Sequence, residues 1–468
     1  MEYTMRFSAA AAKYNSTTRT TNGMVAHKNT GSAVLDLFSN IGSSRGLDLT
    51  NLFFSALEEN EELALRVLLW ARDIRGGAGE RAQFRNLLSA LERYSPVLAA
   101  RVLRRIPELG RWDDVLCVQE PINKQLAFSM IRDALTLKNG LAAKWMPRKG
   151  LLAAQLAKFL NLSPKQYRKL IVGLSNVVET QMSQKRWDEI NFSQVPSVAA
   201  ARYQNAFKRN AEERYAEYVK ELQKPDSAVK INASAVYPHD VLKSLNLGQE
   251  EVAEAQWKAL PDYLNDNSVF PIVDTSGSMG YIGHFTSPPQ PIHVAVSLGL
   301  YVAERNKSDF KDLAMIFSEQ PKLVQLSGSL KKRLGQMKEI VAANTNLHAA
   351  FDMLLQIAVR GNVAPQHMPK TLLILSDMQF DHCIQFDDSA YQMIHRKYES
   401  AGYVAPRIIF WNLHGGYNNT PVEMDSSGAA LVSGFSPAIL KSVLNNTLQN
   451  FTPYQIMLDT VMIDRYEV

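Results

Sequence analysis

Apolar residues recur at helical spacing through residues 50–222. In one segment they fall at positions i, i+3, i+4 and i+7, which places them on a single face of a helix. The members of that face are Phe84, Leu87, Leu88 and Leu91. Residues 61–74 repeat the spacing, and Gly76-Gly77 provides a turn between the two segments. Strand-like alternation is almost absent, so the pattern predicts stacked helix pairs of the HEAT type, without a strict sequence period.

The pattern changes after Asn267, where short apolar runs alternate with helical segments. The predicted strands are Val269–Val273, Leu313–Phe317, Thr371–Leu375 and Arg407–Trp411. The predicted helices between them are Pro291–Arg305, Leu347–Val359 and Ser389–Glu399. This alternation predicts a Rossmann-like α/β domain, in which helices cover both faces of a mostly parallel sheet.

These patterns divide the chain into three predicted parts. Residues 1–22, rich in Ala, Ser and Thr, are predicted to form a flexible arm. Residues 23–265 are predicted to form the HEAT-like helical domain, and residues 266–468 the α/β domain. Because an α/β domain of this length can bury a sufficient core, we expect it to fold without the helical part.

The composition is that of a globular protein, with 46% hydrophobic and 21% charged residues. Two distant cysteines, Cys117 and Cys383, form neither a disulfide framework nor a cysteine-based zinc site, which indicates a reducing compartment. The sequence contains no signal-like apolar start and no apolar run long enough for a membrane span. We therefore expect a cytoplasmic protein without a membrane partner.

Polar side chains follow the predicted strands at the edge where parallel sheets bind ligands. Asp274, Ser276 and Ser278 follow the first strand, Thr345 precedes a helix, and Asp377 follows the strand that begins at Thr371. Carboxylate and hydroxyl oxygens suit a hard cation, and a set with few carboxylates favours Mg²⁺ over Ca²⁺. The alternative is a turn in which Asp and Ser cap their own backbone. The strand before the loop and the two later residues favour the metal site.

Asp274, Ser276, Ser278, Thr345 and Asp377 resemble the metal-ion-dependent adhesion site of von Willebrand factor A domains. The resemblance implies that Asp274 and both serines bind the ion directly. It also implies that Thr345 binds directly or through water, and that Asp377 acts through water. A further coordination position would accept water or an acidic group of a protein partner.

Further motifs are spread along most of the chain. They are Arg72–Arg81, Lys144–Gly150, Ile190–Ser197, Tyr237–Asp240, Ser376–Phe380 and Val432–Pro437. In this order they resemble DUF2828, a family of uncharacterised proteins. That family in turn resembles the Ro/TROVE proteins, which join a ring of HEAT-like helices to a von Willebrand A domain. The resemblance implies binding of small structured or misfolded RNAs, but it assigns no RNA contact to a residue of this chain.

Basic residues are concentrated between Lys138 and Arg209, where 13 Lys and Arg stand against three acids. The whole chain carries a net charge of only +5, so the remainder is acidic. Local positive charge of this kind favours phosphate binding. The predicted RNA-binding residues are Lys144, Arg148, Lys149, Arg168, Lys169, Lys185 and Arg186. The aromatic candidates for base stacking are Trp145, Tyr167, Trp187, Phe192, Tyr203 and Phe207. Solvated helix faces and core aromatics are the alternative interpretation.

An enzyme is not expected. The glycine-rich stretch from Arg75 to Glu80 follows a helix and lacks the lysine of a phosphate loop. The loop at Asp274 lacks the second carboxylate of an Asp-x-Asp nucleophile motif, and the histidines have no zinc or triad spacing. The sequence thus favours an RNA-binding ribonucleoprotein scaffold with a metal site for a partner. The alternative is a protein-binding adaptor that uses the metal to take a partner carboxylate and has no RNA role.

Overall fold

The computed structural model describes residues 15–44, 46–175, 177–224, 229–233, 236–317, 319–338, 344–382, 388–417, 419–444 and 451–468. These residues pack into two compact units. The α/β unit contains the described residues up to Val67, Tyr237–Glu254 and Pro261–Glu467. The helical unit contains Leu68–Val236, Ala255–Leu260 and the terminal Val468. Helices α4 (Glu61–Arg72) and α15 (Glu250–Ala259) contribute residues to both units.

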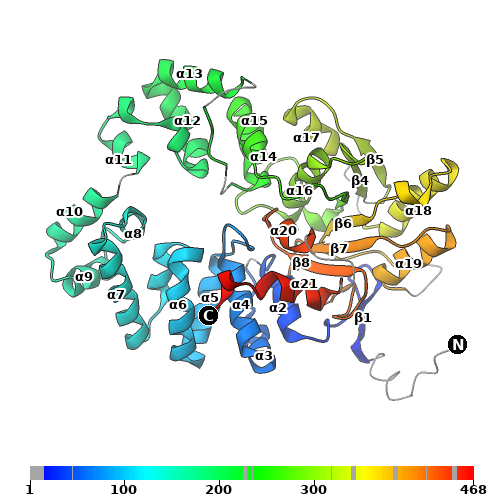
Figure 1. Ribbon diagram of the computed structural model, residues 1–468, viewed down its shortest axis with the longest axis horizontal. Coiled ribbons are helices and arrows are strands. Elements are labelled where there is room, and N and C mark those ends of the chain that lie inside the picture. The colour runs from blue at the N-terminus through cyan, green and yellow to red at the C-terminus, as the bar shows by residue number, and fades with distance from the viewer. Residues whose placement is uncertain are drawn as a thin grey trace. The chain divides into compact units, whose positions relative to one another are not determined.

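The α/β unit is built on a six-stranded sheet with the order β5-β4-β3-β6-β7-β8 (Figure 1). The strands are β3 (Phe270–Asp274), β4 (Leu313–Phe317), β5 (Lys322–Gln325), β6 (Thr371–Ser376), β7 (Arg407–Asn412) and β8 (Ala429–Ser433). All neighbours are parallel except β5, which pairs antiparallel with β4 at the edge. Numbered within the sheet, the order is 3-2-1-4-5-6, the doubly wound arrangement. The Rossmann-like prediction is confirmed, including all four predicted strands.

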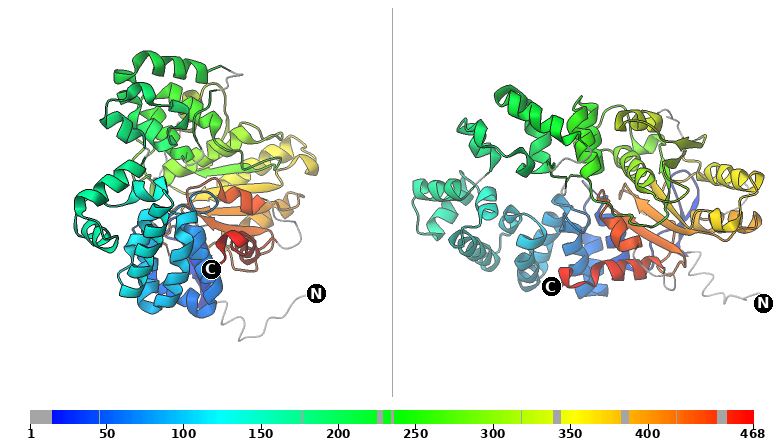
Figure 2. Two further views of the ribbon diagram at one scale, coloured as in Figure 1. Left: turned by 60° about the vertical axis from the view of Figure 1, so that its left-hand side comes forward. Right: turned by 45° about the horizontal axis from the view of Figure 1, so that its top comes forward.

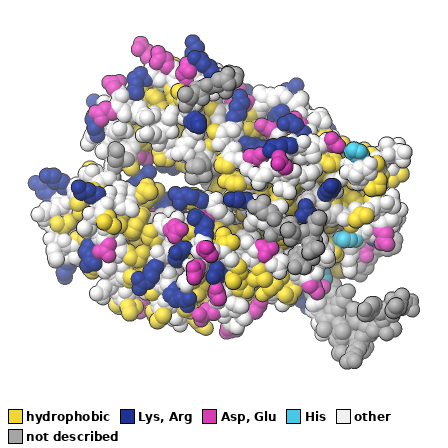
Figure 3. Space-filling model, viewed as in Figure 1, with side chains coloured by type: hydrophobic (Ala, Val, Ile, Leu, Met, Phe, Trp, Pro, Cys, Tyr) yellow, Lys and Arg dark blue, Asp and Glu magenta, His cyan; other side chains and the backbone are white. Residues whose placement is uncertain are grey.

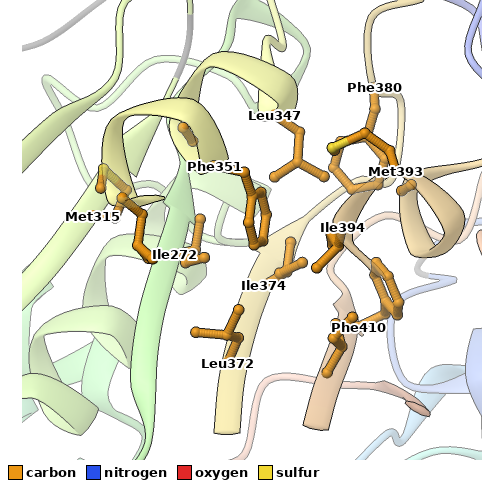
Figure 4. Close-up of a cluster of buried hydrophobic side chains, with 14 of the residues drawn as sticks. Ile272, Met315, Leu347, Phe351, Leu372, Ile374, Phe380, Met393, Ile394 and Phe410 are labelled. Atoms are coloured by element: carbon orange, nitrogen blue, oxygen red, sulfur yellow. The ribbon is translucent and has the colours of Figure 1, made fainter. Parts of the chain in front are cut away.

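One face of the sheet is covered by α18 (Leu347–Arg360) and α19 (Ala390–Ser400). Figure 4 shows Phe351 of α18 and Ile394 of α19 directed at Ile272, Ile374 and Phe410 on the central strands. The other face carries α16 (Pro291–Arg305), which lies so close that a Cβ on Gly299 would meet Val273 at 2.4 Å. Both faces are therefore buried, which explains why these strands are continuous apolar runs.

The remaining elements of the α/β unit lie around this sandwich. They are α14 (Pro238–Asn246), η4 (Gly277–Met279), α17 (Leu330–Lys338), η5 (Pro365–His367), α20 (Ile439–Leu444), α21 (Pro453–Val461) and η7 (Asp464–Tyr466). Helix α14 packs against α16, and α21 packs against β8. No helix in the described part of the chain is both long and apolar enough to cross a membrane.

The N-terminal segment differs from the prediction, because it belongs to the α/β unit. It contains β1 (Thr17–Arg19), β2 (Val25–His27), α2 (Ala33–Ile41) and α3 (Thr50–Glu59). His27 N donates to Thr420 O at 2.9 Å, and Gly42 N donates to the Ser433 hydroxyl of β8 at 3.0 Å. The predicted boundaries at residues 22 and 265 therefore do not match the two units. Residues 1–14 of the predicted arm lie outside the described residues, and residues 17–19 form a strand.

Asp36 of α2 supplies a pH-dependent contribution to stability. Burial raises its pKa from 3.8 to about 6, although Thr30 N donates to Asp36 Oδ1 at 2.9 Å. A carboxyl whose pKa is raised in the folded state costs stability when ionised, and the cost disappears as pH falls from 7 toward 4. We expect Asp36→Asn to stabilise the protein at pH 7 by about 1–2 kcal/mol and to be nearly neutral at pH 4. Urea unfolding at both pH values measures this, and a pH-independent difference would contradict it.

The helical unit consists of consecutive helices that pack against their neighbours, as Figure 2 shows from two sides. Its helices are α5 (Ala82–Tyr94), α6 (Pro96–Leu109), α7 (Pro121–Thr136), α8 (Gly140–Trp145), α9 (Leu151–Phe159), α10 (Pro164–Leu174), α11 (Val178–Ser183), α12 (Ser197–Asn210) and α13 (Glu212–Leu222). Short 3-10 helices are η1 (Trp112–Cys117), η2 (Trp187–Glu189) and η3 (Phe192–Gln194). Ser95 and Ser163 cap α6 and α10 with proline next in sequence. The helical prediction is confirmed.

Candidate metal centre and nucleic-acid interface

Asp274 lies at the end of β3, where the chain leaves the sheet. Its side chain is fully buried and is held from two sides. The Ser376 hydroxyl at the end of neighbouring β6 donates to Asp274 Oδ2 at 2.5 Å, and Ser276 N donates to Oδ1 at 2.9 Å. Adjacent parallel strands thus fix the orientation of the carboxylate at the carboxyl edge of the sheet, where open α/β sheets bind ligands.

The two serines of the loop place their hydroxyl oxygens side by side. Ser276 Oγ lies 3.2 Å from Ser278 Oγ. Ser276 is buried, whereas Gly277 and Ser278 are exposed, so the loop forms the boundary between the buried carboxylate and solvent. Gly280 ends the turn with φ of +103°, and a Cβ there would meet Gln290 Oε1 at 2.6 Å. Glycine is therefore required for this loop to close.

Asp377 follows β6 and carries an unsatisfied oxygen. Gln379 N donates to Asp377 Oδ1 at 3.1 Å, but Oδ2 is buried and accepts no hydrogen bond from the described residues. Burial raises the pKa of Asp377, while the Ser278 hydroxyl lowers it. An ionised oxygen in this position has lost its water without gaining a donor, which costs free energy unless a cation or proton is present.

Thr345 joins the site from a third loop and is tied to it by the N-terminal segment. Asn22 Nδ2 donates to Thr345 Oγ1 at 3.3 Å and to Gln379 O at 2.8 Å. Thr21 N donates to Gln379 Oε1 at 2.8 Å. The predicted arm therefore holds the loops that carry Thr345 and Asp377. Asn22, Thr21 and Gln379 were not predicted as part of the site, because no local motif relates them to the loops they contact.

The two carboxyl groups repel each other's negative charge. Burial, and then the charge of Asp377, raises the pKa of Asp274 to about 7. Two buried carboxyls with mutual repulsion and an unsatisfied oxygen fit a divalent cation, because the ion would neutralise both charges. The described residues contain no group of three or more His, Cys, Asp or Glu that could hold a metal. The candidate set has only two such groups, and its other members are hydroxyl oxygens of the kind that Mg²⁺ accepts.

The predicted RNA-binding residues lie in three places on the helical unit. Lys144 lies in the last turn of α8, and Arg148 and Lys149 lie in the loop that follows. Arg168 and Lys169 lie on α10, and Lys185 and Arg186 follow α11. The first two places are adjacent, because the Tyr167 hydroxyl of α10 donates to Pro147 O at 3.0 Å. Arg186 pairs with Glu189 at 2.7 Å. On the face drawn in Figure 3, lysine and arginine side chains form several separate groups over the helices.

Comparison with known proteins assigns the helical unit in part. Residues 154–270 match the model of a domain of unknown function, DUF2828. This segment of the chain is therefore similar to DUF2828 domains. This match confirms the resemblance indicated by the sequence motifs. Residues 268–459 match the model of a second domain of unknown function, DUF7788, which covers the strands β3 to β8.

Two further similarities cover nearly the whole chain. The uncharacterized protein L728 of Acanthamoeba polyphaga mimivirus is 29% identical over 94% of this chain and 86% of its own length. The crystal structure of the Deinococcus radiodurans Ro (RSR) protein is similar with a TM-score of 0.47 and 14% identity, over 94% of this chain and 100% of that chain.

The segment that matches DUF2828 contains some of the predicted basic residues and excludes others. Arg168, Lys169, Lys185 and Arg186 lie inside the matched segment, whereas Lys144, Arg148 and Lys149 precede it. The prediction of base stacking is wrong for three aromatic residues. Tyr167, Phe192 and Phe207 are buried in the core of the unit, so their rings cannot contact a base. Phe192 and Phe207 pack on each other with ring centroids 5.2 Å apart. Trp145, Trp187 and Tyr203 are half-buried and retain an accessible surface.

Proposed function

We propose that the helical unit binds RNA and that the α/β unit holds a divalent cation, so that the protein acts as a non-enzymatic ribonucleoprotein scaffold. The observation that carries the RNA proposal is the set of unneutralised cations between Lys138 and Arg209. Of these 13 residues, 12 are exposed and Lys144 is half-buried. Among the described residues, only Arg186 of this set forms an ion pair with a carboxylate.

Unpaired surface cations favour nucleic acid for a physical reason. Phosphate neutralisation releases condensed counterions, so affinity comes from the number of free cations and not from one precise contact. Cations already paired with carboxylates contribute less to RNA affinity, because their charge is already neutralised. The half-buried Trp145 and Trp187 offer faces on which unpaired bases stack. A structured RNA with a single-stranded end uses both features, and this is the ligand class that we propose.

The metal part of the proposal rests on the unsatisfied Asp377 oxygen and the buried Asp274 carboxylate. Asp274, Ser276, Ser278, Thr345 and Asp377 would hold Mg²⁺ through oxygen atoms alone. The ion supplies positive charge at the sheet edge, next to the exposed Ser278. This exposure also supports the second candidate, an adaptor whose metal accepts a partner's carboxylate. The two functions use different units and are separable by experiment.

Charge reversal is expected to separate the two candidates. Changing Lys144, Arg148, Lys149, Arg168 and Lys169 to Glu should weaken RNA binding by about 100-fold or more near 0.1 M salt and flatten its salt dependence. Fluorescence anisotropy with a labelled hairpin RNA that carries a single-stranded tail measures both quantities over a salt series.

The matched control reverses five exposed cations of the α/β unit and changes the net charge equally. These are Lys311, Lys332, Arg360, Lys370 and Lys441. We expect it to weaken binding by less than about fivefold, because distant surface charges are screened beyond about 10 Å. Equal losses of RNA affinity in both variants would show that binding depends on the overall charge of the protein and not on the proposed set of cations. An absence of wild-type binding at low salt would leave the adaptor as the supported function.

A further inference from the structure

A cluster of arginines surrounds two aspartates where α5 meets η1. Asp114 is fully buried and accepts hydrogen bonds from Arg72 Nε at 2.7 Å and from Arg85 Nε at 2.6 Å. Asp113 forms an ion pair with Arg85 Nη2 at 3.0 Å and accepts a hydrogen bond from Arg111 Nε at 2.9 Å. These contacts fix the guanidinium groups of Arg85 and Arg111, whose side chains are still 31% and 27% exposed.

The cluster contains more positive charge than its two aspartates neutralise. Arg81 precedes α5 by one residue and accepts the Arg85 amide at 3.1 Å, so the two side chains start one helical turn apart. Arg81 is exposed and forms no ion pair with the described residues. Burial, and then the charges of Arg111 and Arg85, lowers its pKa. Arg81 thus adds, one helical turn from Arg85, a positive charge that no carboxylate of the cluster pairs with.

A tryptophan completes the cluster from α8. The guanidinium carbon of Arg111 lies 3.7 Å from the centroid of the Trp145 ring, and Lys144 Nζ lies 5.4 Å from the same ring. Stacking on the ring, together with the Asp113 pair, leaves the Arg111 fork little rotational freedom. A ligand that binds here therefore loses less side-chain entropy than one that must order free surface arginines.

We propose that Arg81, Arg85 and Arg111, beside Trp145, form a phosphate-binding subsite for the RNA backbone. The proposal rests on the proposed RNA-binding function and locates a specific contact within it. Phosphate is the fitting anion, because Arg81 has no carboxylate partner among the described residues and its guanidinium fork can bind two phosphate oxygens. Arg85 and Arg111 are already paired with Asp114 and Asp113, and they add positive charge beside it. The subsite lies outside the residues from Lys138 to Arg209 except at Lys144 and Trp145, so sequence charge alone did not identify it.

Arg81→Gln tests the subsite in the full-length protein, because an exposed arginine without an ion pair can be changed without breaking the buried pairs. We expect RNA affinity to fall by about 3- to 10-fold and the salt slope to decrease by about one, the signature of one lost phosphate contact. Arg81→Lys should restore most of the slope but not all of the affinity, because it keeps the charge and loses the fork. Arg104→Gln, at an exposed position on α6, is the matched control and should change the affinity by less than about twofold.

The outcomes separate this subsite from the proposed function. Wild-type RNA binding that Arg81→Gln leaves unchanged would overturn the subsite and leave RNA binding in place. If the wild type binds no RNA, calorimetry with inorganic tripolyphosphate decides. If the wild type binds tripolyphosphate and Arg81→Gln does not, the phosphate subsite is supported although the protein does not bind RNA. If neither protein binds tripolyphosphate, the subsite is overturned. Melting temperatures of all variants should agree within about 2 °C, since surface changes alter stability by less than about 0.5 kcal/mol.

Discussion

A chain that begins at residue 237 is expected not to fold, whereas a chain in which a long Gly/Ser linker replaces residues 68–236 is expected to form the α/β unit. The first variant lacks the N-terminal segment that packs on the sheet. Fully buried side chains in that segment include Leu35, Leu37, Phe38, Ile41 and Phe53. Each contributes about 1.5–3 kcal/mol by burial, and their sum of about 7.5–15 kcal/mol is comparable to the typical domain stability of about 5–15 kcal/mol.

The linker variant is the matched control, because it retains every segment of the α/β unit and removes the helical unit except Ala255–Leu260 and Val468. Near-ultraviolet circular dichroism and cooperative thermal unfolding distinguish a packed core from a collapsed chain. Cooperative unfolding by both variants would show that β3 to β8 with their own helices are sufficient. That result would restore the prediction made from sequence that residues 266–468 fold alone.

The central strands were predictable because burial on both faces leaves a sequence signal. Strands β3, β4, β6 and β7 are runs of apolar residues between polar loops, and their observed bounds differ from the predicted ones by at most one residue at either end. Strand β5 lies at the sheet edge with three of its four residues exposed, so it has no apolar run. Strand β8 is buried but begins with two alanines, whose strand propensity is low. Neither strand was predicted.

The partner of an amphipathic helix was not predictable from its period. Helix α2 has the apolar face expected of a helix in the helical domain, and the sequence continues from it into further helices. Its apolar face instead packs against β8, with Ser433 Oγ donating to Phe38 O at 3.1 Å. Periodicity identifies a buried face but contains no information about which element covers it. The boundary prediction at residue 22 failed for this reason.

The candidate metal residues could be predicted one by one from sequence, but their proximity depends on the order of the strands in the sheet. Asp274 and Asp377 were identified from their positions after predicted strands, and the structure places those strands next to each other. Asn22 lies 323 residues before Thr345 and 357 before Gln379, so its hydrogen bonds to them depend wholly on the tertiary fold. The aromatic residues show the opposite limit, since helical spacing did not distinguish the buried Tyr167 from the half-buried Trp145.

Asp274→Asn is expected to abolish Mg²⁺ binding while leaving the metal-free protein at least as stable as the wild type. The carboxylate is fully buried, and its charge lies close to that of Asp377. An amide keeps one oxygen for the Ser276 N–H donor, and its nitrogen can donate to the Ser376 hydroxyl in place of the bond that this hydroxyl now donates. The substitution removes the charge that attracts the cation. Removing a buried charge that repels its neighbour reduces the desolvation cost in the absence of metal. Calorimetry with Mg²⁺ should show binding by the wild type and none by the variant.

Thermal unfolding gives the second readout. The difference in melting temperature between the wild type and Asp274→Asn should have opposite signs with Mg²⁺ and with EDTA. With Mg²⁺ at about 100 times its Kd, the wild type should gain about 2.7 kcal/mol, and its melting temperature should rise relative to EDTA. Asp274→Asn should melt at the same temperature in both conditions, and in EDTA no lower than the wild type. Asp425→Asn, at an exposed position in the same unit, is the matched control and should behave as the wild type. A variant that unfolds earlier in EDTA would show that Asp274 stabilises the fold through its hydrogen bonds. Equal Mg²⁺ stabilisation of wild type and Asp274→Asn would place any bound cation away from this carboxylate.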